Sequence, residues 1–189
     1  MRLERTFVTE HGPTFQVTFR DLDDQLRFLR QLISGPKVTI GGLTIGEYRA
    51  DPAIRELAVR IIKEAGAEMR DKKAQALAIG QWVQDNIYYV HEMPERFATP
   101  LEVLRAGAGD CDDGVPLVGS LLECIGIPSG MVCMNINGAW SHIFPTAIMQ
   151  ATGRQLPLDW TMRNFSVLEV KNPIVWAYER GKTVRIKLA

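Results

Sequence analysis

The run Gly109-Asp110-Cys111-Asp112-Asp113-Gly114 surrounds one thiol with three carboxylates and two glycines, directly before an apolar helical stretch. Cysteines that only fill a protein core have apolar neighbours, so this is a poor setting for a buried structural thiol. The start of a helix is also a typical place for a nucleophilic cysteine. Cys111 is therefore the first candidate for a reactive residue.

The helix that follows Cys111 is predicted from an apolar stripe at helical spacing, formed by Val118, Leu121, Leu122 and Ile125. If this helix began at Cys111, Pro116 would lie in its interior, where a proline costs about 3 kcal/mol. We therefore expect regular helix to start near Gly114, with Asp113 as its cap. Cys111 would then lie in a tight turn before the helix.

A reactive thiol in this acidic setting requires a histidine nearby. A free thiol with a pKa of about 8.5 is only about 3% thiolate at pH 7, and neighbouring carboxylates oppose its ionisation. Of the three histidines, His11 lies in a predicted turn and His91 at a predicted helix end, so we choose His142. Asp159 is expected to accept the second ring proton of His142 and to orient the ring.

Strand parity constrains the pairing of His142 and Asp159. The two residues share one face of an antiparallel hairpin only if the loop holds an even number of residues. A loop of two or four residues around Ala151 to Arg154 would meet this condition. Pro145 lies in the same strand, where a proline is expected to need a bulge or a sheet edge.

The remaining pattern predicts helices and strands in a mixed order. We expect a β-hairpin over 5–9 and 14–19, helices over 21–33, 51–69 and 71–88, a short β segment over 37–45, a helical turn from Thr99, and strands over 131–136, 139–149, 155–160 and 183–188. This order indicates an α+β fold. We expect an N-terminal β-hairpin and helix extension over residues 1–50 and a core over 51–189.

The composition excludes several classes of protein. With 22 basic and 22 acidic residues and no basic stripe, nothing favours nucleic acid or an anionic membrane as a partner. No apolar run approaches the ~20 residues of a spanning helix, and the N-terminus has no apolar signal region. Three irregularly spaced cysteines are typical of reduced thiols. We expect a cytoplasmic protein.

Taken together, the motifs resemble the transglutaminase-like cysteine hydrolase superfamily. The resemblance covers roughly 51–161 and rests on the cysteine run, the continuation over 121–128, Ser141-His142-Ile143-Phe144 and Leu158-Asp159-Trp160-Thr161. It implies a papain-like core with helices packed on an antiparallel sheet and the cysteine at a helix N-terminus. It also implies that Cys111 is the nucleophile, His142 the general base and acid, and Asp159 the orienting carboxylate. No cofactor is implied.

Other site residues are less clearly indicated. No glutamine stands shortly before Cys111 to serve as an oxyanion donor, as it does in papain-like proteases. We expect the backbone N–H of Cys111 and one upstream side chain instead, with Asn86, Tyr88 and Tyr89 as candidates. Trp140 is the candidate for a wall of the substrate cleft. The cysteine and histidine spacings do not support a zinc site, so no metal is expected.

Two functions from different classes are compatible with this pattern. The first is a thiol-dependent amide hydrolase or acyltransferase, working through a Cys111 thioester on a peptide or protein substrate. The second is a noncatalytic binding or assembly module with the same fold, for instance one encoded with viral or mobile-element structural proteins. Its N-terminal residues and the tail from Met162 could then serve as docking strands. The pattern indicates no particular oligomeric state.

Overall fold

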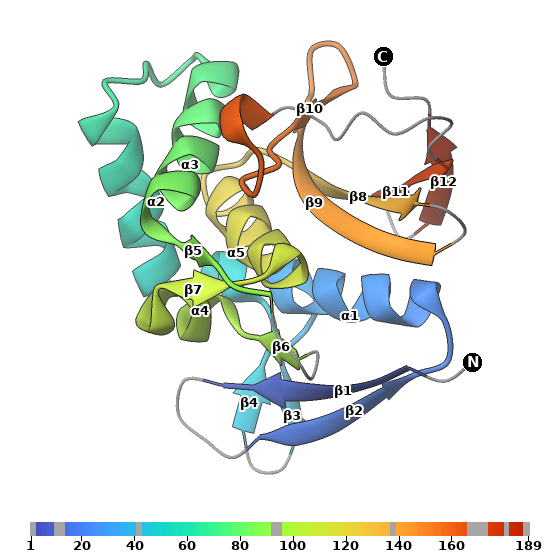
Figure 1. Ribbon diagram of the computed structural model, residues 1–189. Coiled ribbons are helices and arrows are strands. Elements are labelled where there is room, and N and C mark those ends of the chain that lie inside the picture. Colours follow the sequence, from blue (N-terminus) through green and yellow to red (C-terminus); the bar gives the residue numbers. More distant parts are fainter. Residues whose placement is uncertain are drawn as a thin grey trace.

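A computed structural model describes residues 3–9, 14–40, 43–91, 96–136, 139–165, 174–179 and 182–186. The fold is built around α5 (Cys111–Glu123), which runs through the middle of the molecule (Figure 1). Helices α2 (Pro52–Glu64) and α3 (Lys72–Asn86) pack on one side of α5, and a five-stranded sheet packs on another. Helix α1 (Leu22–Ser34) also packs against α5. The predicted α+β class, with helices on an antiparallel sheet, is confirmed.

The main sheet has the strand order β10-β9-β8-β11-β12, and every neighbouring pair is antiparallel. Its strands are β8 (Ser129–Ile136), β9 (Ala139–Met149), β10 (Arg154–Pro157), β11 (Ile174–Glu179) and β12 (Lys182–Ile186). β8, β9 and β12 match predicted strands closely. β10 ends before Asp159, which therefore lies just beyond the strand. β11 was not predicted.

Pro145 lies in β9, an interior strand of this sheet, and pairs with Met131 of β8. The expectation that it would need a sheet edge or a bulge was wrong, because the register shift lies elsewhere, at Met134/Asn135. The carbonyl of Pro145 accepts the backbone N–H of Leu158, so the proline nitrogen points to the same side. β10 ends at Pro157, before the residue that lies opposite Pro145. The missing N–H of Pro145 therefore removes no regular hydrogen bond between β9 and β10.

A smaller sheet joins the N-terminus to the segment before the cysteine loop. β1 (Leu3–Val8) and β2 (Phe15–Phe19) form the predicted antiparallel hairpin, and β1 pairs on its other edge with β6 (Arg96–Ala98) in parallel. The turn that contains His11 lies outside the described residues. The predicted division of the chain after residue 50 stays a prediction.

The helices start where aspartates cap them. The side chains of Asp21, Asp51 and Asp71 accept backbone N–H groups in the first turns of α1, α2 and α3. Two helices end sooner than predicted: α2 ends at Glu64, shortly before Gly66 with a left-handed φ of 63°, and α3 ends at Asn86. The remaining elements are β3 (Val38–Ile40), β4 (Leu43–Ile45), η1 (Tyr48–Ala50), β5 (Tyr88–Tyr89), α4 (Pro100–Ala106), β7 (Ala108–Gly109) and η2 (Arg163–Phe165).

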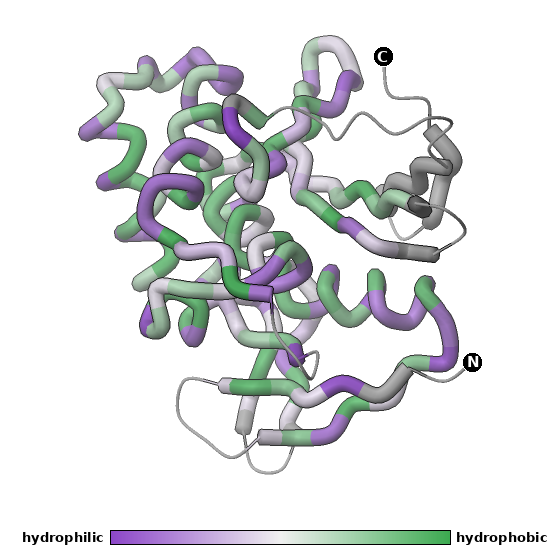
Figure 2. Tube along the Cα trace, viewed as in Figure 1, coloured by the Kyte–Doolittle hydropathy of each residue, from purple (hydrophilic) through white to green (hydrophobic). Residues whose placement is uncertain are grey.

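Helix α5 is buried on all sides. Every residue from 112 to 122 is buried, and the hydrophobic positions of the helix lie in the middle of the molecule (Figure 2). Leu117, Val118, Leu121 and Leu122 join a cluster formed with α2 and α3. Val115 joins a second cluster formed with α1 and the small sheet. This burial holds the start of α5 in place. No helix among the described residues is long and apolar enough to cross a membrane.

Candidate active site

Helix α5 begins at Cys111 itself, and Asp110 is its N-cap. A carboxylate oxygen of Asp110 accepts the backbone N–H groups of Asp112 (3.1 Å) and Asp113 (3.4 Å), and Asp113 accepts the N–H of Asp110 in return (3.3 Å). The expected cap at Asp113 and the tight turn around Cys111 were therefore wrong. The capping box and the burial of the helix together outweigh the cost of Pro116.

The three carboxylates around Cys111 are buried and lie close together, with oxygen atoms within 4.8 Å of one another. Asp113 also accepts the backbone N–H of Ala98 at 2.6 Å, which ties the start of α5 to β6. The contacts of Asp110 and Asp113 are those of residues at the start of a helix. We assign no metal to this cluster.

His142 and Asp159 are in direct contact. Nε2 of His142 lies 2.7 Å from Oδ2 of Asp159, with the histidine side chain 10% exposed and the aspartate side chain 0% exposed. Met149 pairs with Arg154, which leaves a loop of four residues, 150–153, between β9 and β10. The predicted even-numbered loop is confirmed, and it explains why the two side chains meet.

Thr161 forms hydrogen bonds with the oxygen of Asp159 that does not contact His142. This oxygen, Oδ1, accepts the hydroxyl of Thr161 at 2.7 Å and the backbone N–H of the same residue at 3.3 Å. The carboxylate thus has both oxygens bound inside the protein, and its orientation toward the ring of His142 is fixed. Sequence reasoning did not assign a role to Thr161. The available signal was an aspartate two residues before a threonine, a spacing at which such side chains often bond locally.

Cys111 lies where α5 packs on β8 and β9. It packs against the hydrophobic cluster that contains Cys133 and Ile143, which are paired across the two strands. Burial raises the pKa of the Cys133 thiol, and the nearby negative charge of Asp112 raises it further. The first turn of α5 is therefore close to the part of β9 that carries His142.

The loop after β10 also packs directly on the start of α5. The indole of Trp160 lies so close to Gly114 that a Cβ at this position would overlap the indole nitrogen. Trp160 is 3% exposed and belongs to the main core. This contact links the neighbour of Asp159 to the helix that carries Cys111. A glycine near the predicted start of the helix was the available signal for such a close approach.

The two candidate tyrosines lie on the exposed strand β5. Tyr88 is 79% exposed and Tyr89 is 51% exposed. β5 runs parallel to β7, which leads directly into Asp110 and Cys111. The ring of Tyr89 also lies 6.1 Å from that of Trp160, measured between ring centroids. β5 thus lies beside β7, the strand that directly precedes Asp110 and Cys111.

The remaining candidates are placed differently. The side-chain amide of Asn86 donates to the carbonyl of Trp82 at 2.8 Å, at the end of α3. The backbone of Trp140 lies in β9 and pairs with Asn135, while its side chain lies outside the described residues. His91 is exposed and follows β5 rather than ending a helix.

The family follows from the sequence itself, which matches the model of the Transglutaminase-like superfamily over residues 55–176. The chain belongs to this superfamily. The match includes the three residues of the expected triad. No curated protein matches the sequence significantly.

Two solved structures resemble this member of the transglutaminase-like superfamily. The first, a candidate protease from Parabacteroides distasonis, has 14% sequence identity and a TM-score of 0.58, over 94% of this chain and 33% of that chain. The second, a candidate cysteine protease from Cytophaga hutchinsonii, has 18% identity and a TM-score of 0.45, over 75% of this chain and 54% of that chain. This chain thus spans about a third of the Parabacteroides protein, and that likeness shows a shared fold.

Proposed function

We propose that this chain is a thiol-dependent amide hydrolase or acyltransferase that works through a thioester on Cys111. The observation that carries the proposal is the contact between His142 and a fully buried Asp159, close to the start of the helix that begins with Cys111. An imidazole oriented by a carboxylate is the partner that a cysteine nucleophile requires. The substrate that we propose is a peptide or a protein.

The proposed acylation step uses both nitrogens of His142. Because Nε2 contacts Asp159, Nδ1 is the atom that exchanges a proton with Cys111. The sulfur attacks the amide carbonyl carbon, and the carbon–nitrogen bond then breaks. His142 gives its proton to the departing amine, and a thioester remains on Cys111. Asp159 stabilises the positive charge that the ring carries between these events.

The thioester is resolved by a second nucleophile. Water gives a carboxylic acid, and an amine gives a new amide. In both cases His142 takes the proton of the nucleophile and the Cys111 sulfur leaves. The backbone N–H of Cys111 as the oxyanion donor stays a prediction.

We also propose that Tyr89 forms a wall of the substrate cleft, because successive side chains of a strand point to opposite faces and Tyr89 is the one whose ring lies near Trp160. Tyr88 and Tyr89 are both large, exposed side chains on β5, beside the segment that leads into Cys111. Exposed aromatic rings can bind apolar substrate groups with little loss of conformational entropy. The tilted contact between the rings of Tyr89 and Trp160 supports a fixed position for this wall.

A cytoplasmic location is part of the proposal. None of the three cysteines forms a disulfide. Cys111 and Cys124 are half-buried and Cys133 is buried. Reduced thiols are typical of proteins in reducing compartments, and a cysteine nucleophile needs its thiol in this state.

The experiment that tests the proposed function is trapping of the thioester. The protein is mixed with a p-nitrophenyl ester, and the acylated residue is located by mass spectrometry of peptides. We expect acylation at Cys111, its loss in Cys111→Ala, and a loss in His142→Ala. Cys124→Ala is the matched control and should acylate as the wild type does. Adding methylamine to a glutamine-containing peptide then separates transamidation, which gives the methylamide, from hydrolysis.

The same experiment distinguishes the noncatalytic alternative. Equal acylation of all three cysteines, or unchanged acylation in His142→Ala, would contradict the proposed mechanism. A protein that acylates no cysteine and still binds a partner when it carries Cys111→Ala would instead be an assembly module.

A further inference from the structure

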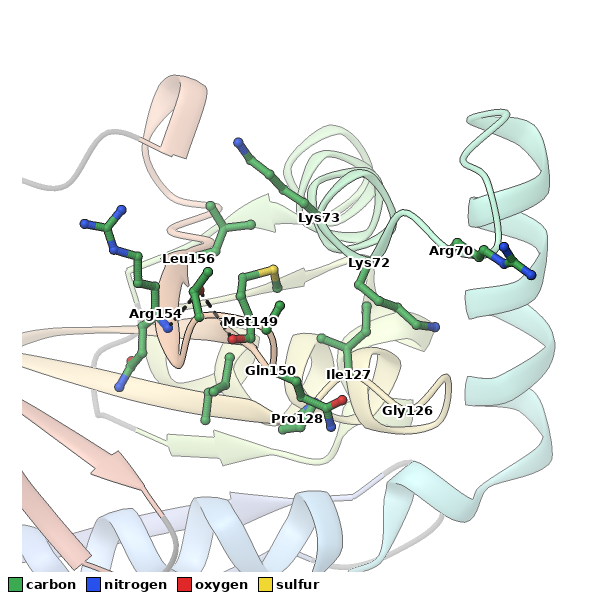
Figure 3. Close-up of a pocket in the computed structure, with 14 residues that line it drawn as sticks. Arg70, Lys72, Lys73, Gly126, Ile127, Pro128, Met149, Gln150, Arg154 and Leu156 are labelled. Atoms are coloured by element: carbon green, nitrogen blue, oxygen red, sulfur yellow. Dashed lines mark hydrogen bonds between the residues drawn. The ribbon is translucent and has the colours of Figure 1, made fainter.

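A cavity of about 660 Å³, drawn in Figure 3, is lined by residues 126–128, which follow the end of α5 that lies opposite Cys111. It is bordered by the start of α3, the segment after α5 and the β9–β10 hairpin. α5 has 13 residues, which at 1.5 Å per residue is about 20 Å, so the cavity is separate from the candidate active site. Cavities of this size are typical of binding sites.

All the charged side chains that line the cavity are basic. Its 14 lining residues include four bases, Arg70, Lys72, Lys73 and Arg154, and no carboxylate. Among the described residues, none of these four bases forms an ion pair with an acidic side chain. Uncompensated charge of one sign in a hollow raises the local potential and attracts groups of the opposite charge. The lining of the cavity is therefore suited to a ligand with negative charge.

Two of these bases flank the hollow. Lys73 on α3 and Arg154 on β10 stand on either side of Met149 and Leu156, whereas Arg70 points away (Figure 3). Lys72 lies between these groups and donates to Gln75 at 3.1 Å and to the carbonyl of Ile125 at 3.3 Å. Lys73 and Arg154 are thus the bases best placed to meet a ligand.

The floor of the cavity is apolar. It is formed by Ile127, Pro128, Ile148, Met149 and Leu156. No aromatic residue lines the cavity, so it lacks the stacking surface on which proteins bind single-stranded nucleic acid. In Figure 3 the amino group of Lys72 points away from the charged ends of Lys73 and Arg154, so the bases do not meet at one point as the binding of a single phosphate by all of them would require. Spaced negative charges with apolar groups between them are the feature of an acidic peptide.

We propose that this cavity binds an acidic, partly apolar peptide segment of a partner protein, with carboxylates at Lys73 and Arg154 and an apolar side chain over Met149. The proposal does not depend on the catalytic role of Cys111.

The test is direct binding of a fluorescein-labelled peptide of Glu-Glu-Leu repeats to the full chain, followed by fluorescence anisotropy. We expect a dissociation constant on the order of 10 μM. Raising the salt concentration from about 50 mM to about 300 mM should weaken the binding of the peptide, because exposed charges are screened. The double variant Lys73→Glu, Arg154→Glu should bind about tenfold more weakly or worse. The matched control Arg60→Glu, Lys63→Glu, on the exposed face of α2, should bind as the wild type does.

Several outcomes would overturn the proposal. The first is no binding by the wild type at about 1 mM peptide. A second is equal weakening in the α2 control. A third is displacement of the peptide by inorganic phosphate or by oligo(dT) at matched ionic strength, which would assign the cavity to a phosphate-bearing ligand. Equal thermal unfolding of the two double variants shows that both are folded.

Discussion

Nε2 of His142 and Oδ2 of Asp159 lie 2.7 Å apart, across a hairpin whose four-residue loop puts both residues on one face. The histidine comes from inside β9 and the aspartate from just beyond β10. The loop itself includes Gly153, whose φ of 67° lies in the left-handed region. A buried carboxylate against a nearly buried ring selects one ring orientation, on which the proposed chemistry relies.

Asp159→Asn should lower the rate of Cys111 acylation by about 10²- to 10⁴-fold, because an amide does not stabilise an imidazolium and permits the wrong tautomer. The rate is measured with a p-nitrophenyl ester under single-turnover conditions. Asp85→Asn, an exposed carboxylate on α3, is the control and should keep the wild-type rate. An unchanged rate in Asp159→Asn would remove this residue from the mechanism.

Thr161→Val should lower the acylation rate by roughly tenfold and the stability by about 1–3 kcal/mol, since it leaves one oxygen of a buried carboxylate without its hydroxyl donor. Thr161→Ser keeps the donor and should recover most of the rate. Thermal unfolding and acylation kinetics measure the two effects. If serine fails to rescue while both variants are equally stable, the hydroxyl does not position Asp159.

Gly114→Ala should destabilise the protein by about 1–3 kcal/mol, because the added methyl group overlaps the indole of Trp160. Trp160→Phe removes the overlapping indole nitrogen. The double variant should therefore lose less stability than the two single variants together, by about 1 kcal/mol. Urea unfolding of all four proteins gives this coupling. Additive losses would mean that the two residues are not in contact.

Cys124 should resist alkylation until the solution is strongly alkaline. Burial raises the pKa of its thiol to about 11, and the positive charge of Arg55 only partly opposes this shift. The raised pKa keeps the reactive thiolate scarce below pH 11. Cys133 is deeper and its pKa is also raised, so it should react more slowly still.

The measurement is brief iodoacetamide labelling at a series of pH values, with peptide mass spectrometry. Arg55→Gln removes a charge that favours the thiolate and should slow the labelling of Cys124 further. Arg60→Gln on the same helix should not change it. Rapid labelling of Cys124 in the folded protein near pH 8 would contradict the burial that the structure gives this thiol.

The amino-acid sequence determined the features that depend on neighbours along the chain. Aspartate caps at positions 21, 51 and 71, the N-terminal hairpin and the helix after Cys111 are local patterns, and the structure has all of them. The even loop between β9 and β10 was also predictable, because strand parity follows from a period of two. These local rules were enough to pair His142 with Asp159.

Only the tertiary structure decided where α5 begins and how Pro145 fits into β9. Local rules predict a cost in free energy for Pro116 inside α5 and for Pro145 inside β9. They do not show that burial stabilises α5, or that β10 ends beside Pro145. The Trp160–Gly114 contact and the basic cavity likewise join residues far apart in the sequence. Packing energies of this kind depend on which surfaces meet in space, and no window of neighbouring residues contains that information.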